Sequence, residues 1–306
     1  MGSAAAPRAR RRGWLAGSGA VMPLTPLQAE VLSLLAAHRS PSSHIAGATG
    51  LLMSPRAPRR SHDVDLFHDA EEEVARAFAA DRTTLERHGI RVTVILSQPG
   101  FIRAEVRGRA EEILRMDWAH DSRWRFLPPV CVQDAGYVLH PVDLAVNKAL
   151  ALAGREEPRD FVDLLYLLER VLPLGALVWA SVGKDPGLNP AMLLDLLARK
   201  GRIEQHAIDR LDLAYPFAMK EAGKRYRAAL QAARAWIATR DPDEVGCLYQ
   251  RPDRPLFFAP NPGDDYRIHH GAPGGVLPTL TNNTPFFADP AARAELESFF
   301  DRPIGE

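Results

Sequence analysis

The sequence predicts an α/β (α+β) fold, with a mixed sheet and flanking helices followed by a helical domain and an irregular tail. Three observations predict it. Strand-like alternation and helical spacing follow one another up to residue 140. Helical spacing dominates 141–240, and prolines and glycines become dense after 241. We therefore expect a disordered leader at 1–22, an α/β domain at 23–140, a helical domain at 141–240 and a Pro/Gly-rich tail at 241–306.

The α/β part begins with a clear helix signal. Thr25 can cap the helix, Pro26 suits its first position and Gln28 completes a capping box. A second helix is expected at 71–88, where Gly89 provides the stop signal. Alternation of apolar and polar residues predicts a half-buried strand at 90–96. The other expected strands lie at 44–46, 63–67, 101–106 and 113–119.

The second part of the chain is expected to be helical. Helical spacing occurs at 142–153, 161–172, 189–198, 203–211 and 215–239. The last of these segments carries a basic face made of Lys220, Lys224, Arg225, Arg227 and Arg234. That face could track an RNA backbone, although a solvated helix face is the more frequent explanation of such a pattern. The tail is expected to pack as irregular structure or to remain mobile.

Composition excludes several classes of protein. The net charge of the 306 residues is +0, so no global basic field argues for nucleic acid. Two cysteines, Cys131 and Cys247, exclude a disulfide framework and fit a reducing compartment such as the cytoplasm. No apolar run approaches the roughly 20 residues that span a bilayer, so we expect no membrane association. The short apolar stretch after Arg8–Arg12 is interpreted as part of the leader rather than as a signal peptide.

The most informative residues are Asp63 and Asp65. On a strand, side chains alternate with period two, so both carboxylates lie on one face. Two hard oxygen ligands on one face can hold Mg²⁺ or Mn²⁺. The small residues Gly47, Ala48 and Thr49 upstream form a turn that lets backbone amides approach an anion. Together these residues predict a metal-dependent site for nucleotide phosphates.

A third carboxylate is expected on a neighbouring strand, because nucleotidyl transfer uses metal ions held by two or three acids. Asp117 closes an alternating segment and is the best candidate, while Asp121 is a weaker alternative. An isolated Asp-x-Asp is usually a pair of surface acids. The small-residue turn followed by Arg-x-Ser-x-Asp-x-Asp on an apolar strand favours the functional interpretation.

A second group of polar residues lies around Lys148, which interrupts an otherwise apolar helix. Burying an ammonium there is costly unless an anion pairs with it. Lys148 could contact a triphosphate, or it could reach solvent or pair with Asp163. Asp160 and Asp163 share a face of the next helix and could orient Lys148 or help to place metal or substrate. Arg159 and Asp160 could equally form a helix-capping salt bridge.

These motifs resemble the AbiEii/AbiGii toxin-like nucleotidyltransferases of the polymerase-β-like superfamily. The resemblance covers roughly residues 25–240. It rests on Gly47-Ala48, on Arg59-x-Ser61-x-Asp63-Val64-Asp65, and on Lys148 followed by Arg155, Arg159-Asp160 and Asp163. It implies an NTP-using, Mg²⁺-dependent transferase with a polymerase-β-like sheet. On that pattern Asp63 and Asp65 would bind metal, and Lys148 and Asp160 would complete the catalytic site. Asp117 remains the third metal-binding acid expected from the strand pattern. Nucleotide contacts are expected from Gly47, Ala48, Thr49, Arg59, Ser61 and Lys148.

The resemblance also suggests a biological role. Members of this kind often serve as toxins of toxin–antitoxin or phage-defence pairs, and some modify the 3′ end of tRNA. We therefore expect NMP transfer to RNA and a cognate antitoxin partner. The alternatives are a protein or small-molecule acceptor, or an inactive nucleotide-binding module. One departure is Gly47-Ala48, because the family usually has Gly-Gly or Gly-Ser there, and Thr49 is the candidate to replace the lost hydroxyl.

Overall fold

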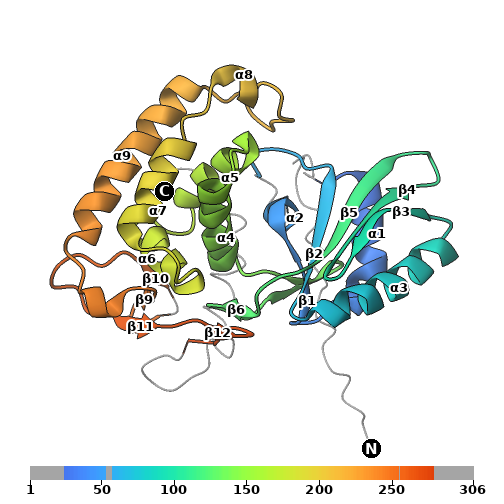
Figure 1. The fold of residues 1–306 in the computed structure, drawn as a ribbon, viewed down its shortest axis with the longest axis horizontal. Coiled ribbons are helices and arrows are strands. Elements are labelled where there is room, and N and C mark those ends of the chain that lie inside the picture. The colour runs from blue at the N-terminus through green and yellow to red at the C-terminus, as the bar shows by residue number, and fades with distance from the viewer. Residues whose placement is uncertain (1–23, 53–56, 255, 279–306) are drawn as a thin grey trace, which may run out of the picture.

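The computed structural model describes residues 24–52, 57–254 and 256–278. The expected leader at 1–22 and the end of the expected tail lie outside these residues. The described chain forms a mixed sheet on one side and a group of helices on the other (Figure 1). The predicted mixed α/β fold, with a mixed sheet and flanking helices, is therefore confirmed. None of the described helices is long and apolar enough to cross a membrane.

The main sheet has seven strands in the order β3-β4-β5-β2-β1-β8-β7. Its central strand β2 (Asp63–His68) is antiparallel to β1 (Ser43–Ala46) and parallel to β5 (Ile113–His120). The remaining strands are β3 (Arg91–Gln98), β4 (Phe101–Arg107), β7 (Val130–Val132) and β8 (Gly136–Val138).

One face of this sheet packs against α1 (Pro26–Leu35) and α3 (Glu71–Arg87), as Figure 1 shows. The apolar core between them includes Val31, Leu66, Phe78, Met116 and Trp118. The expected capping box of α1 is present, because Thr25 and Gln28 exchange hydrogen bonds of 3.2 and 2.8 Å. The opposite face carries α2 (Gly47–Leu52) and turns toward the helical part of the chain.

The helical part of the chain has a hydrophobic core of its own. This part consists of α4 (Pro141–Gly154), α5 (Pro158–Leu168), α6 (Leu174–Lys184), α7 (Pro190–Lys200), α8 (Gln205–Ile208) and α9 (Met219–Ile237). Helix α6 was not predicted from the sequence. Every residue from Leu174 to Val182 is buried, so this helix lacks the polar face that creates a helical period.

Two predicted helices are shorter than expected. Segment 203–211 is helical only in α8, and the chain then extends to pair with 58–60. The Arg60 amide donates to the Asp212 carbonyl at 2.7 Å, and the Ala214 amide donates to the Pro58 carbonyl at 2.9 Å. Helix α9 begins at Met219 rather than at 215, because Pro216 disfavours helical backbone in the residue before it.

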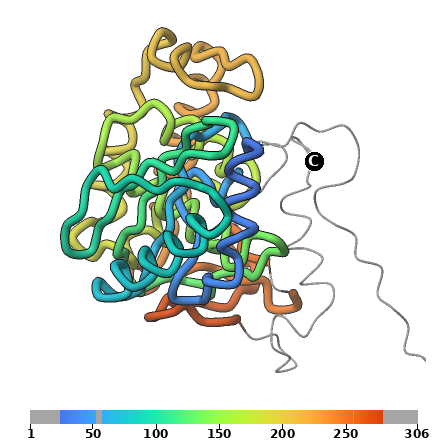
Figure 2. The backbone as a smooth tube through the Cα atoms, turned by 90° about the vertical axis from the view of Figure 1, so that its right-hand side faces the viewer, coloured from blue at the N-terminus to red at the C-terminus, as the bar shows by residue number. Residues whose placement is uncertain are grey.

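The strand predicted at 90–96 is present as β3 (Arg91–Gln98), but the predicted half-burial is wrong for most of its length. β3 is an edge strand, and only Val92 along it is buried. The described part of the tail is also more regular than expected. β9 (Leu248–Gln250), β10 (Phe257–Phe258) and β11 (Arg267–His269) form a small sheet, and β12 (Ala272–Pro273) pairs with β6 (Trp124–Arg125). Figure 2 shows these red strands along the base of the molecule.

Candidate active site

The turn between β1 and α2 requires a glycine. Gly47 has φ +58°, a left-handed conformation that side chains with a Cβ rarely adopt. A Cβ on Gly47 would also lie 1.9 Å from Oδ2 of Asp65. The small residue therefore allows the backbone of one strand end to approach a carboxylate on the next strand.

Strand β2 separates apolar from acidic side chains with the predicted period of two. Val64, Leu66 and His68 are buried on the face covered by α1 and α3. Asp63 and Asp65 lie on the opposite face of the strand. Asp117 is the register partner of Asp65 on the parallel strand β5. The sheet therefore places the three predicted carboxylates together on one face.

These carboxylates line a pocket of about 180 Å³ between the sheet and the helical part. Ser61 lies at its wall, and its hydroxyl accepts a hydrogen bond of 3.3 Å from the Asp63 amide. The lining residues are Gly47, Ala48, Arg59, Ser61, Asp63, Asp65, Phe67, Arg103, Arg115, Asp117, Lys148, Arg155 and Arg159.

Arginines from the adjacent strands hold two of the three acids. The Arg103 guanidinium donates to both oxygens of Asp117, at 2.8 and 2.6 Å. Arg115 donates to Asp63 at 2.5 Å, and Arg159 approaches the same oxygen at 3.5 Å. The hydrogen bond to Asp117 raises the pKa of Arg103 further. These arginines supply positive charge beside the acids.

Asp65 differs from its two neighbours because it forms no ion pair within the described residues. Burial raises the pKa of its carboxyl, and the negative charges of Asp117 and Asp63 add to this effect. The positive charge of Lys148 opposes it. A cation bound between the three acids would remove this repulsion.

Lys148 on α4 is buried and held by two carboxylates of α5. Its ammonium lies 3.0 Å from Oδ1 of Asp160 and 2.7 Å from Oδ2 of Asp163. Burial disfavours the charged form of both carboxyls, but Lys148 together with Arg155 at Asp160, and together with Arg59 at Asp163, outweighs it, so both pKa values are lowered. Both interpretations of Lys148 are compatible with this arrangement, because the side chain pairs with Asp163 and also lines the pocket.

Two further arginines complete this buried network. Arg59 makes a bidentate pair with Asp163, with both distances 2.8 Å. Arg155 donates to Asp160 at 2.7 Å. The two acids of α5 therefore position three cations at the pocket, and Asp160 itself lies behind Lys148 rather than in the wall.

Two predicted candidates lie elsewhere. The Thr49 side chain is buried, and its hydroxyl donates to the Asp63 carbonyl at 2.9 Å. It therefore links α2 to β2 and is not among the lining residues. Asp121, the alternative third acid, pairs with Lys184 at 3.4 Å and also lies outside the pocket lining.

Sequence reasoning missed Arg103 and Arg115 as pocket residues. A signal for Arg115 was available, because it precedes Asp117 by two positions and so shares its strand face. Arg103 required knowledge of the pairing between β4 and β5, which places it opposite Asp117.

The donor chemistry of the pocket suits a hard divalent cation, since carboxylate oxygens are its preferred ligands. Within residues 24–52, 57–254 and 256–278, however, no three His, Cys, Asp or Glu side chains are already arranged to hold a metal. Arginine side chains pair with Asp63 and Asp117 instead. Asp65 remains as the acid that lacks a counter-ion of its own among the described residues.

Three of the five residues that define the basic face of α9 have acidic partners. Lys224 pairs with Glu221 at 3.1 Å, Arg234 pairs with Asp195 at 3.0 Å, and Arg225 pairs with Glu169. This pattern is typical of a solvated helix face.

Comparison with known proteins places these features in a family. The profile of the AbiEii nucleotidyltransferase toxin of the type IV toxin–antitoxin system matches residues 34–239, more than half of the chain. No curated protein matches the chain significantly.

Two solved structures are similar to the described fold. The nucleotidyltransferase toxin MenT4 from Mycobacterium tuberculosis H37Rv is 18% identical, with a TM-score of 0.49 over 71% of this chain and 83% of that chain. JHP933 from Helicobacter pylori is 14% identical, with a TM-score of 0.43 over 69% of this chain and 90% of that chain.

Proposed function

The chain belongs to the AbiEii family of nucleotidyltransferase toxins of type IV toxin–antitoxin systems, and from this premise we propose its reaction. The protein transfers a nucleoside monophosphate from an NTP to an RNA acceptor, with the 3′ end of tRNA as the preferred candidate. The reaction depends on Mg²⁺ or Mn²⁺ and takes place in the cytoplasm, and a cognate antitoxin counteracts its effect. The observation that carries the proposal is the grouping of Asp63, Asp65 and Asp117 on one sheet face beside Lys148.

The acidic and the basic residues of the pocket have different roles in the proposed reaction. Asp63, Asp65 and Asp117 would hold the divalent cation, which supplies charge neutralisation at the α-phosphate and the leaving pyrophosphate. Lys148, Arg59 and Arg155 present positive charge to the triphosphate. Asp160 and Asp163 keep these cations in place, because each carboxylate contacts two of them.

The acceptor hydroxyl must lose its proton as it attacks the α-phosphorus. A carboxylate beside that hydroxyl can take the proton, and Asp117 or Asp65 is positioned on the sheet face for this role. The new bond forms from the acceptor oxygen to phosphorus, and the bond to pyrophosphate breaks. The amides at the Gly47–Ala48 turn can approach phosphate closely, since neither residue carries a large side chain.

The test is transfer of label from each α-labelled NTP to total RNA in the presence of Mg²⁺. We expect a labelled tRNA-sized band that disappears in the Asp63→Ala/Asp65→Ala variant. Asp121→Ala is the matched control, because this acid lies outside the pocket and should leave labelling intact. Undiminished labelling by the double variant would disprove the site.

A second candidate acceptor is a protein or a small molecule. The net charge of +0 and the ion pairs of Lys224, Arg225 and Arg234 on α9 favour it, because they reduce the positive charge available to RNA. Label found in the protein or small-molecule fraction would support this alternative. NTP binding without labelling of any fraction would instead support an inactive nucleotide-binding module, which Ala48 motivates.

A further inference from the structure

Strand β3 is a long and almost uncharged edge of the main sheet. It pairs with β4 on one side only and has eight residues, whereas the opposite edge strand β7 has three. Between Val92 and Gln98 it contains neither a charged residue nor a proline. Natural edge strands usually carry such residues because exposed backbone groups pair readily with another strand.

The apolar side chains of this edge face solvent. The exposed fractions of Val94, Ile95 and Leu96 are 40%, 58% and 43%. The register with β4 shifts between Val94 and Leu96, so Ile95 lies in a bulge without a partner. A bulge in an edge strand can prevent pairing with a further strand. Here, however, the bulged residue Ile95 has the most exposed side chain of the three.

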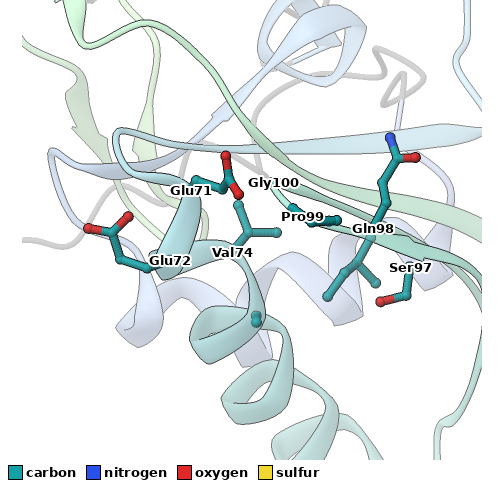
Figure 3. Close-up of a pocket in the computed structure, with 9 residues that line it drawn as sticks. Glu71, Glu72, Val74, Ser97, Gln98, Pro99 and Gly100 are labelled. Carbon is teal, nitrogen blue, oxygen red and sulfur yellow. The ribbon is translucent and has the colours of Figure 1, made fainter.

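An acidic cavity of about 640 Å³ lies at one end of β3. It is formed by the first turn of α3 and the turn from β3 to β4. Figure 3 shows the carboxylates of Glu71 and Glu72 on one side, with Ser97 and Gln98 on the other. Neither glutamate forms an ion pair with another described residue, whereas Glu73 beside them is paired with Arg76.

The other end of β3 carries the only charge of the strand. The Arg91 side chain is 70% exposed, and its partner Glu111, at 2.7 Å, is 63% exposed. Such an exposed pair contributes little, so Arg91 can exchange its partner at low cost.

We propose that β3 is the interface with a second copy of this chain, through antiparallel pairing of the two β3 strands about a twofold axis. An axis between Val94 and Ile95 places Arg91 of each copy opposite Gln98 of the other. Opposed side chains lie about 5 Å apart, so Arg91 comes to lie beside Gln98 at the rim of the acidic cavity that Gln98 lines. The same operation covers the three exposed aliphatic residues, and both ends of the interface become complementary in charge.

This pairing also closes the edge. A twofold contact is isologous, so both copies satisfy the same backbone groups and no free β3 edge remains. The surface involved is one strand and its flanks, which is typical of a weak and concentration-dependent dimer.

Sedimentation velocity across roughly two decades of protein concentration tests the proposal. We expect the wild type to pass from monomer to dimer, and Ile95→Lys to weaken the dimer at least tenfold. Met192→Lys is the matched control, because Met192 is similarly exposed at 50% on α7 and its replacement should change nothing. A wild type that stays monomeric, or a dimer that persists in Ile95→Lys, would overturn the proposal.

Charge reversal tests the twofold register separately. Arg91→Glu and Glu72→Arg should each weaken the dimer at least several-fold, because each creates like charges across the interface. The combined variant restores opposite charges and should recover the affinity. A combined variant as weak as the single variants would show that the two strands do not meet in this register. Thermal unfolding of each variant confirms that the fold is intact.

Discussion

At the residue scale, Gly47 is the position where geometry and chemistry are most tightly linked. Gly47→Ala would place its Cβ against Asp65 and force that carboxylate to move. We expect transferase activity to fall by about 100-fold or more, because a misplacement of about 1 Å is enough for such a loss. Gly263→Ala is the control, since Gly263 also has a positive φ of 92° but nothing within 4 Å of the added Cβ. Equal loss in both variants would mean that backbone strain, not Asp65, limits activity.

Lys148 gives a second prediction at this scale. Lys148→Met removes the cation that Asp160 and Asp163 share, but Arg155 and Arg59 remain, so the loss should stay below the about 3–5 kcal/mol of a buried charge left unpaired. Because the pKa of both carboxyls is lowered, the pair stabilises the wild type above about pH 4 and loses this effect as the pH falls further. Urea unfolding should therefore give a lower free energy of unfolding for Lys148→Met than for the wild type, and this difference should become smaller in acid. Lys220→Met, on the exposed end of α9, should have the free energy of unfolding of the wild type at every pH.

At the element scale, strands β4 and β5 bring Arg103 and Arg115 to the acids that would hold metal. We expect Arg103→Gln and Arg115→Gln to raise the affinity for Mg²⁺ alone roughly tenfold, because each frees a carboxylate. The same variants should bind a non-hydrolysable NTP analogue more weakly, because each removes a positive charge from the pocket that would hold the triphosphate. Calorimetry of both ligands gives the comparison, with Arg107→Gln, outside the pocket on β4, as the control. Parallel weakening of both ligands would show that the arginines only stabilise the strands.

The elements also show what the sequence could predict. Local patterns were sufficient for the acidic face of β2 and the capping box of α1, because period and spacing are local properties. Helix α6 was not predicted because it is buried on all sides and so has no alternation of apolar and polar residues at the helical period. The position of Arg103 and the pairing of 58–60 with 212–214 were not predicted because they depend on contacts between segments that are distant in the sequence.

At the scale of the whole molecule, three buried histidines make the fold sensitive to acid. Burial lowers the pKa of His44 and His140 to about 3 and that of His68 to about 4. A lowered pKa means that the unfolded chain takes up protons first, so stability is complete above about pH 6.5 and falls as the pH decreases toward 4. At pH 5 each histidine costs about 2 kcal/mol. Burial raises the pKa of Asp143 to about 6, which offsets part of this loss.

His68 separates this effect from general acid unfolding. Both its ring nitrogens are buried and lack a hydrogen-bond partner among the described residues, so His68→Leu removes a group that costs free energy to bury. We expect guanidinium unfolding to show that the free energy of unfolding of this variant falls less between pH 6.5 and 5 than that of the wild type. The difference should be about 2 kcal/mol, the contribution of one histidine. His206→Leu, at an exposed position, should follow the wild-type curve. If His68→Leu also follows that curve, His68 does not remain neutral in the folded protein, and the loss of stability between pH 6.5 and 5 must arise at His44 and His140.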